Sequence, residues 1–291
     1  MDGILLIDKP EGLTSHDVVF KARKILNTKK IGHTGTLDPL ATGLLVLMVG
    51  STTKLGKYFS EHDKEYDAEI ILGMETNTDD ITGIVINQAD AGKLSETAIW
   101  HKVSQFEGEI MQIPPNFSAV KVDGRKLYEY ARKNQEIPQV EPKKVTVNSI
   151  SNFRVVDRDD LTVTIGLTCH VSKGTYIRSL ARDIGRSLGV YGTLKSLRRT
   201  AVDDFKLKDA ISIEALSAGH FQFLDPLPCL GMPELVVTEE IKKLISDGRF
   251  LSVSLFQEKS DTVIYDLHHT PLAIYRYDVE NNIMRMSVKL L

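Results

Sequence analysis

The sequence predicts an α+β protein built on a mixed sheet. Strand and helix patterns alternate along residues 3–200, but too irregularly for a doubly wound parallel sheet. A basic segment at residues 112–144 interrupts this alternation as an insertion. After a proline-rich stretch, residues 229–291 read as a small β-rich unit. We therefore expect one large domain over residues 1–228 and a small C-terminal domain over residues 229–291.

The first elements are predicted by apolar runs and turn residues. Residues 3–7 form a short buried strand that ends in a turn. A helix begins after Thr14, which forms a capping box with Asp17. Residues 32–43 are a loop rich in Gly, Thr and Pro, and residues 44–49 form a second buried strand.

The middle of the chain shows clearer periodicity. Residues 65–72 alternate apolar and polar side chains, which predicts a half-buried strand. Ser95 is expected to cap a helix that runs to Phe106. Residues 145–156 and 161–171 are predicted to form two further strands joined by a polar turn.

Basic residues concentrate near the end of the large domain, although the net charge is −3. Residues 170–200 hold seven Lys or Arg and one acid. Thr175 should cap a helix there, and Arg178, Arg182 and Arg186 recur every fourth residue along one outward face. Such a surface can attract phosphates. A solvated helix face explains the same charges equally well.

The insertion at residues 112–144 differs in character from its surroundings. Paired prolines open it, two tyrosines are interleaved with its charges, and a short helix is predicted at residues 126–133. We expect a mobile segment rather than part of the core. The residues Lys121, Arg125, Lys126, Arg132 and Lys133 make it basic.

Composition excludes several classes of protein. Cys169 and Cys229 are too few and too far apart for a disulfide framework or a zinc site, so we expect two buried thiols. No signal-like segment opens the chain, and the longest apolar run, residues 44–49, is too short to cross a membrane. We expect a cytoplasmic protein without metal or membrane attachment.

Residues 32–43, GHTGTLDPLATG, carry the strongest signal for chemistry. Three glycines let the backbone approach a ligand closely. Pro39 biases Asp38 toward an extended conformation, which could present its carboxylate to a cleft. The commoner reading of a loop aspartate is that it satisfies turn amides. No Gly-Lys-Ser/Thr follows, so this is not a Walker phosphate loop.

This segment resembles the catalytic loop of TruB-type pseudouridine synthases, G-H-x-G-x-L-D-P-x-A-x-G. Other signatures of that family recur in order, so the resemblance covers residues 3–200, and Asn77 replaces a commonly acidic residue. It implies a mixed, mainly antiparallel sheet flanked by helices, a thumb at residues 112–144 and a small PUA-like C-terminal module. The matching segments are Leu6–Pro10, Lys64–Tyr66, Thr76–Gly83, Gly174–Arg178 and Leu197–Arg199.

The resemblance also implies roles for site residues. Asp38 acts on the sugar as nucleophile or base, and Arg178 keeps it ionised unless it belongs to the phosphate-binding face. Tyr66 stacks on the extruded base. Tyr176 and Leu197 form the apolar floor and wall of the pocket.

Further residues are assigned with alternatives. His33 inserts into the RNA loop where the base has left, whereas Lys9 is either a turn residue or a substrate contact. Asp80 is a candidate supporting carboxylate. Contacts to RNA phosphates, which position the RNA without specifying its sequence, are expected from Lys121, Arg125, Lys126, Arg182 and Arg186.

These features predict conversion of uridine to pseudouridine, at position 55 in the T-loop of tRNA. The reaction involves no redox change and loses no atoms, so no cofactor is expected. We expect a monomer that needs no guide RNA. Two other classes remain open: an RNA-binding protein in which Asp38 is idle, and a glycoside hydrolase, which needs a second carboxylate such as Asp80.

Overall fold

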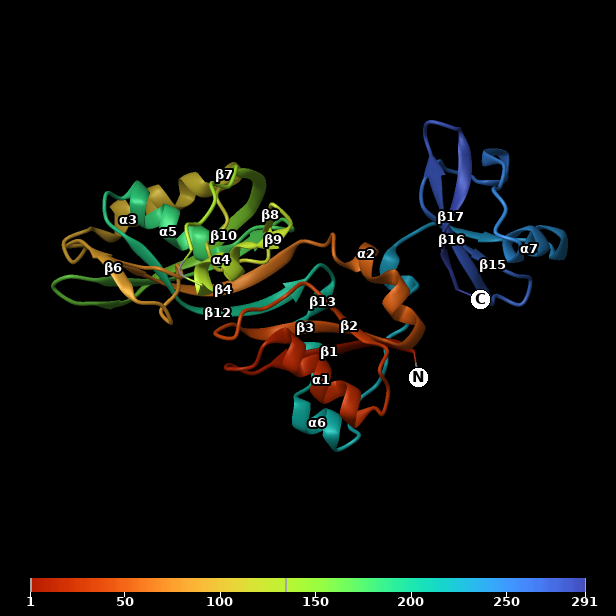
Figure 1. Cartoon of the computed structure of the whole chain (residues 1–291), viewed down its shortest axis with the longest axis horizontal. Helices are drawn as coiled ribbons and strands as arrows, with labels where there is room; N and C mark the ends of the chain where they lie inside the picture. The colour runs from red at the N-terminus through yellow and green to blue at the C-terminus, as the bar shows by residue number, and fades with distance from the viewer. Residues whose placement is uncertain (1, 134, 291) are drawn as a thin grey trace.

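A long, strongly twisted sheet forms the body of the protein in the computed structural model, which describes residues 2–133 and 135–290 (Figure 1). Met1, Asn134 and Leu291, which the predicted domains and insertion include, lie outside the described residues. The strands run in the order β1-β3-β12-β4-β11-β10-β7, with β2 beside β3 and β13 beside β12. Within the described part of this sheet only β12 and β3 pair in parallel, so the predicted mixed, mainly antiparallel sheet is confirmed. The strands are β1 (Gly3–Lys9), β2 (Ile31–Thr34), β3 (Thr42–Val49), β4 (Lys64–Leu72), β7 (Gly108–Gln112), β10 (Lys143–Arg158), β11 (Val163–Val171), β12 (Gly192–Val202) and β13 (Phe205–Lys206).

Helices cover the two halves of this sheet separately. Apolar residues of α1 (Ser15–Ile25) and α6 (Ile213–Ser217) share a core with β1 and β3. Those of α3 (Glu96–Val103) and α5 (Ile177–Ser187) share another core with β4 and β11. Figure 1 shows the first pair below the sheet and the second pair above it. The short helix α2 (Gly56–Phe59) follows β3.

Local signals explain where these helices begin. The predicted capping box is present: Thr14 Oγ1 accepts from Asp17 N at 3.0 Å, and the Asp17 carboxylate accepts from Thr14 N at 2.9 Å. Ser95 caps α3 through Ala98 N, as expected. The prediction is wrong for α5, whose N-cap is Tyr176 rather than Thr175 and makes no side-chain cap bond.

The C-terminal domain has its own sheet, as predicted. Its strands are β14 (Glu234–Val236), β15 (Thr262–Tyr265), β16 (Pro271–Asp278) and β17 (Ile283–Lys289), and α7 (Glu239–Ser246) packs against them. A shared apolar cluster, to which Val263 and Ile274 contribute with Ile4 and Phe59, joins this domain to the large one. Among the described residues, no helix is long and apolar enough to span a membrane.

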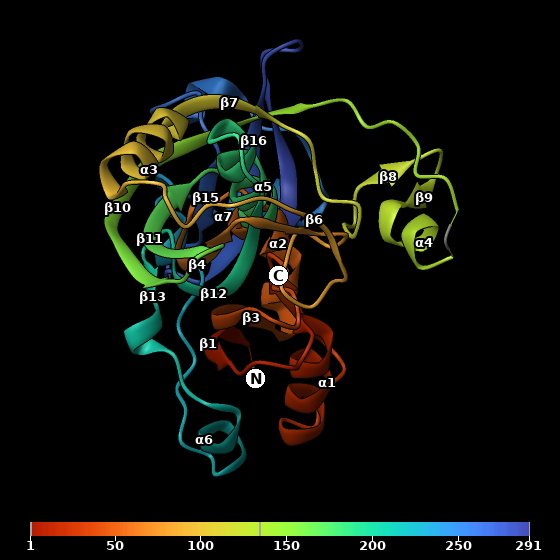
Figure 2. The ribbon, with the colours of Figure 1, turned by 90° about the vertical axis from the view of Figure 1, so that its left-hand side faces the viewer.

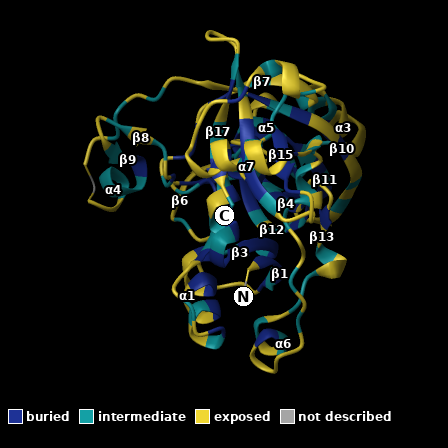
Figure 3. Ribbon diagram, turned by 90° about the vertical axis from the view of Figure 1, so that its right-hand side faces the viewer, coloured by how far each residue is buried: buried dark blue, intermediate teal, exposed yellow. Residues whose placement is uncertain are grey.

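The insertion leaves the sheet between β7 and β10 and stands to one side of it (Figure 2). It contains the hairpin β8 (Lys121–Val122) and β9 (Arg125–Lys126), followed by α4 (Leu127–Arg132), which confirms the short predicted helix. Most of the segment is exposed or half-buried (Figure 3). The insertion is shorter than the predicted residues 112–144, because Gln112 and Lys143 pair within the main sheet.

Several elements differ from the sequence-based expectation. The predicted loop at 32–43 begins inside β2, which pairs with β3. The central strand β12 and the hairpin β5 (Met74–Thr76) and β6 (Val85–Gln88) were not predicted. Both cysteines are free thiols; Cys169 is buried as expected, whereas Cys229 is only half-buried.

Candidate active site

A cavity of about 710 Å³ opens where the loop after β2, strands β4 and β12, the start of α5 and the insertion meet. Asp38, Tyr66, Tyr176, Arg178 and Leu197 all line it. The topology brings together residues that are up to 159 positions apart in the sequence. The predicted grouping of these five side chains is therefore observed.

The loop that carries Asp38 is held from both sides. Ser15 Oγ accepts from Leu37 N at 2.8 Å and donates to Leu37 O at 3.1 Å. Gly12 N donates to Pro39 O at 2.8 Å. These bonds fix the residues before and after Asp38, so its carboxylate is held at the cavity wall.

Lys9 contributes to the same restraint. Its side chain is fully buried, and its ammonium donates to the carbonyls of Pro10, Leu13 and Pro39 at 2.9, 2.6 and 3.5 Å. Lys9 does not line the cavity. Of the two roles expected for Lys9, these contacts favour the turn residue over the substrate contact, because an ammonium that is withdrawn from water needs internal acceptors.

Arg178 links three parts of the site. Its Nε lies 2.9 Å from Asp38 Oδ2. Its other nitrogens donate to Thr78 O at 3.1 Å and to Phe117 O, in the insertion, at 3.0 Å. Only 5% of Arg178 is exposed. The guanidinium is therefore directed at the carboxylate and not outward to a phosphate-binding face.

Two opposing effects act on the Asp38 carboxyl group. Burial raises its pKa above the ordinary value, and the nearby Asp80 adds to that increase. The charge and hydrogen bond of Arg178 oppose it. Arg178 thus favours the ionised form that a nucleophile or base requires.

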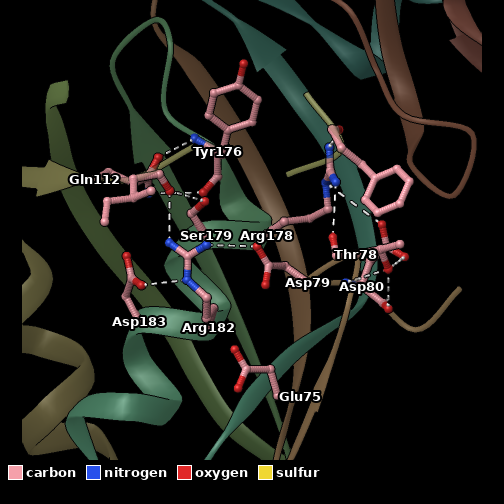
Figure 4. Close-up of polar contacts among 12 residues, drawn as sticks. Glu75, Thr78, Asp79, Asp80, Gln112, Tyr176, Arg178, Ser179, Arg182 and Asp183 are labelled. Atoms are coloured by element: carbon pink, nitrogen blue, oxygen red, sulfur yellow. Dashed lines mark hydrogen bonds and ion pairs between the residues drawn. The ribbon is translucent and has the colours of Figure 1, made fainter. Parts of the chain in front are cut away.

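Asp80 lies near the same nitrogen of Arg178 as Asp38, with its Oδ2 at 3.9 Å from Nε. Its Oδ1 accepts from Thr78 Oγ1 at 2.9 Å (Figure 4) and also from Thr82 N at 3.0 Å. The Asp80 carboxylate therefore stabilises the conformation of its own loop and lies beside the guanidinium of Arg178. This agrees with a supporting carboxylate better than with a second catalytic acid.

The side chains of Tyr176 and Tyr66 line the cavity, and hydrogen bonds hold the backbone of each residue in place. The Gln112 side chain accepts from Tyr176 N at 2.8 Å and donates to Tyr176 O at 3.1 Å. Burial raises the pKa of the Tyr176 hydroxyl. Tyr66 lies on the buried face of β4, opposite Arg199 of β12.

His33 lies outside the cavity, and its insertion into the RNA loop stays a prediction. It is half-buried on β2. Its Nδ1 is buried without a hydrogen-bond partner among the described residues, and burial lowers the pKa of the ring.

The predicted outward stripe of arginines on α5 is wrong. Arg182 is 7% exposed, and its guanidinium contacts Asp79 Oδ2, Asp183 Oδ1 and Ile113 O, each at 2.9 Å (Figure 4). Together these contacts leave the guanidinium buried, so Arg182 is directed away from solvent phosphates. Arg186 is exposed, although it pairs with Glu75 at 2.5 Å.

The basic residues of the insertion are accessible. Lys121 is exposed. Arg125 stacks on Tyr130 with 4.5 Å from its guanidinium carbon to the ring centre, and Lys126 lies 5.4 Å from the ring centre of Tyr128. Tyr128 also lines the cavity, so this basic surface continues into the site.

Lys64 and Arg199 also line the cavity, and neither was assigned a role from the sequence. Both are buried, and each stands in a segment matched to a family signature. Proximity to the other site residues depends on strand pairing that the sequence did not reveal. Within residues 2–133 and 135–290, no group of His, Cys, Asp and Glu side chains is arranged to hold a metal ion.

Two family models match adjoining parts of the chain. Residues 23–177 match the family described as TruB family pseudouridylate synthase (N terminal domain), and residues 178–224 match the tRNA pseudouridylate synthase B C-terminal domain. A tRNA pseudouridine synthase B from Staphylococcus saprophyticus is 40% identical over 289 residues, covering 94% of each chain. That from Clostridium kluyveri is 43% identical over 263 residues, covering 89% of each chain.

Solved structures share the fold. A chain of a Cbf5-Nop10-Gar1 complex superposes with a TM-score of 0.68 at 24% identity, covering 99% of this chain and 84% of that chain. A chain of an H/ACA RNP bound to a substrate RNA containing 2'-deoxyuridine gives 0.67 at 23% identity, with the same coverage.

Proposed function

This chain belongs to the TruB family of pseudouridylate synthases, and from that premise we propose that it converts uridine 55 in the T-loop of tRNA into pseudouridine with Asp38 as its catalytic carboxylate. The enzyme is an isomerase, as its relatives named tRNA pseudouridine synthase B are. One observation carries the residue assignment: Arg178 Nε lies 2.9 Å from Asp38 Oδ2 at the wall of a cavity that Tyr66 also lines.

The chemistry requires little beyond this arrangement. The N1–C1′ bond breaks, the uracil turns, and C5 bonds to C1′; C5 loses a proton and N1 gains one, so the reaction is redox-neutral. Asp38 takes part as a nucleophile at C1′ or as a base at the sugar, and both roles need the ionised carboxylate. Arg178 stabilises that form.

The base must leave its stack before Asp38 can reach the sugar. Tyr66 is proposed to stack on the extruded uracil, with Tyr176 and Leu197 enclosing it, because all three line the cavity. The basic face of the insertion, formed by Lys121, Arg125 and Lys126, is proposed to contact backbone phosphates. Its position beside the cavity supports this role.

The same proposal extends to domains and partners. Residues 1–228 act as the catalytic domain, with the thumb inside residues 112–144, and residues 229–291 as a PUA-like RNA-binding module. The separate C-terminal sheet and core support this division. We expect a monomer that acts on tRNA alone, without a guide RNA.

A reaction with only the purified protein and an unmodified tRNA transcript tests the function. Pseudouridine should form at position 55, detected by carbodiimide-dependent primer extension, and a transcript with cytidine at that position should stay unmodified. Pseudouridine elsewhere would contradict the site. Tight binding without product would favour a non-catalytic RNA-binding protein, and release of free uracil would favour a glycoside hydrolase.

A further inference from the structure

Two buried cations line the candidate active site beside Tyr66. Lys64 is 8% exposed and Arg199 is 1% exposed, and both border the cavity that contains Asp38. Lys64 begins β4, and Arg199 lies on the neighbouring strand β12. A lysine or arginine is seldom buried to this degree unless it is paired.

The hydrogen bonds of Arg199 leave part of its guanidinium free. Nε donates to Leu44 O at 2.7 Å, and Nη2 donates to Gly35 O at 3.2 Å. Within the described part of the chain, Nη1 has no hydrogen-bond partner. Two carbonyls therefore hold the side chain in place, while one amino group remains for another acceptor.

Lys64 is held in a similar way. Its ammonium donates to the carbonyls of Ser60 and His62. Neither Lys64 nor Arg199 forms an ion pair with any carboxylate among the described residues, whereas Arg178 and Arg182 each do. Carbonyl dipoles satisfy hydrogen bonds but do not neutralise charge, so this pair is suited to an anion that arrives with the substrate.

Gly35 shows how close the two cations lie. A Cβ at Gly35 would stand 3.4 Å from Arg199 Nη1 and 3.7 Å from Lys64 Cε, so both side chains pack against the same backbone position. Gly35 has a φ of 79° and lines the cavity. With no side chain at this position, both cationic groups stay accessible to a ligand.

The register relates this pair to the base-binding ring. Tyr66 and Lys64 share the buried face of β4, two residues apart, which corresponds to about 6.6 Å along a strand. Arg199 is directly opposite Tyr66 on β12. A nucleotide whose base stacks on Tyr66 would therefore carry its adjoining phosphate toward Lys64 and Arg199.

We propose that Lys64 and Arg199 form a phosphate-binding subsite for a phosphodiester that flanks the target uridine of the substrate RNA. The proposal rests on the proposed function, because it takes the base to lie on Tyr66. Arg199 and Lys64 offer a fork-shaped and a compact cation to the two free oxygens of the linkage. Their role is to position the nucleotide, not to react with it.

The protonation behaviour of Lys64 agrees with a binding role. Burial, together with the charge of Arg199, lowers the pKa of Lys64 from 10.5 to about 8. Because the pKa of Lys64 is lower in the folded state than in the unfolded state, the charged lysine favours the unfolded state. The charge of Lys64 therefore destabilises the fold at neutral pH. Loss of the charge should then leave the melting temperature equal or higher, whereas a purely structural lysine would lower it.

The test combines a protein change with an RNA change. Lys64→Met is compared with wild type and with Lys93→Met, a matched control on an exposed lysine. Each protein binds a T stem-loop with natural linkages and two versions in which a neutral methylphosphonate replaces the linkage 5′ or 3′ of the target uridine. Dissociation constants, their salt dependence and melting temperatures are measured.

Wild type should lose about tenfold or more in affinity for one of the two neutral RNAs, the expected loss of a charge-assisted hydrogen bond. Lys64→Met should bind natural RNA more weakly than wild type by a similar factor. Replacing the natural RNA with that neutral RNA should weaken its binding by less than about threefold more, because the two changes remove the same interaction. Its salt dependence should fall by about 0.7–0.9 in slope, one phosphate contact. Lys93→Met should match wild type.

Two results would overturn the proposal. One is that the losses of affinity caused by Lys64→Met and by the neutral linkage multiply in full when combined; the other is that wild type binds both neutral RNAs as tightly as natural RNA. The RNA arm needs no protein variant, so wild-type affinity for both neutral RNAs overturns the proposal even if Lys64→Met fails to fold. Arg199→Lys, which keeps a cation, provides a second variant and should show the same coupling. Pseudouridine formation by wild type on natural RNA is scored separately: its absence would refute the proposed function, whereas its presence without coupling would refute only the subsite.

Discussion

The Nε atom of Arg178 lies 2.9 Å from Oδ2 of Asp38, and the same guanidinium donates to the carbonyl of Phe117 in the insertion. One buried side chain therefore contacts both the proposed catalytic group and the segment proposed to contact RNA. Any movement of the insertion at Phe117 changes an acceptor of the arginine that orients Asp38.

Arg178→Met should lower the single-turnover rate at saturating tRNA by about tenfold or more, or ~1.4 kcal/mol, with a smaller change in Kd. Methionine keeps the apolar stem but removes the charge beside Asp38. Rapid-quench measurements of pseudouridine formation test this. On the same helix, the exposed Arg186→Met should weaken binding without slowing the saturated reaction. A wild-type saturated rate for Arg178→Met would remove Arg178 from the site.

The pH dependence should report the Asp38 carboxyl group. Because the reaction needs the ionised form, kcat/KM should be constant above the pKa of Asp38 and fall tenfold per pH unit below it. Burial raises that pKa above 3.8, so the fall begins at a higher pH than for an ordinary aspartate. In Arg178→Met, which loses the main influence lowering this pKa, the fall should move to still higher pH. An unchanged or lower midpoint would contradict the pairing.

Arg182→Met should act on stability, which corrects the expectation of a phosphate contact. The change leaves Asp79 buried without its 2.9 Å ion pair, which costs about 3–5 kcal/mol in comparable pairs. Urea unfolding measures the loss. Asp79→Asn combined with Arg182→Met should recover part of it, since asparagine tolerates the φ of 61° at this position. Normal stability with weakened RNA binding would restore the phosphate role.

Limited trypsin digestion should cut the free protein in the insertion, after Arg132 or Lys133. Both residues are exposed, and residues 135–142 belong to no helix or strand. A T stem-loop should slow this cleavage because Arg132 and Tyr128 line the cavity. A hairpin of equal length with an unrelated loop serves as control. Equal cleavage with and without saturating T stem-loop would argue against a thumb that closes on substrate.

The sequence predicted the parts of the fold that local patterns determine. The alternation from Glu65 to Leu72 marked β4, and the Thr14–Asp17 pair marked the start of α1. Strand β12 was not predicted because Ser196, Arg198 and Arg199 interrupt its apolar pattern. Its register also shifts twice against β4, which breaks the alternation of side chains. A central strand held by neighbours on both sides needs no alternation of its own.

The site was predictable where a contiguous motif marked it, as for Asp38. The orientation of each side chain was not. Arg182 looked like a surface residue by its helical spacing, but its partner Asp79 is 103 positions away in the sequence. Lys9 and His33 likewise stand in matched segments, yet neither lines the cavity. Such pairings depend on tertiary contacts that periodicity does not contain.

The most direct test of the account replaces only the proposed catalytic carboxylate. Asp38→Asn preserves the size of the side chain, so the loop and the distributed basic contacts that bind RNA should persist. Tritium release from C5-labelled uridine in unmodified tRNA, under single-turnover conditions, should fall to background while Kd stays within a few-fold of wild type. Substantial tritium release by this variant, with deamidation excluded by mass spectrometry, would contradict the assignment of Asp38.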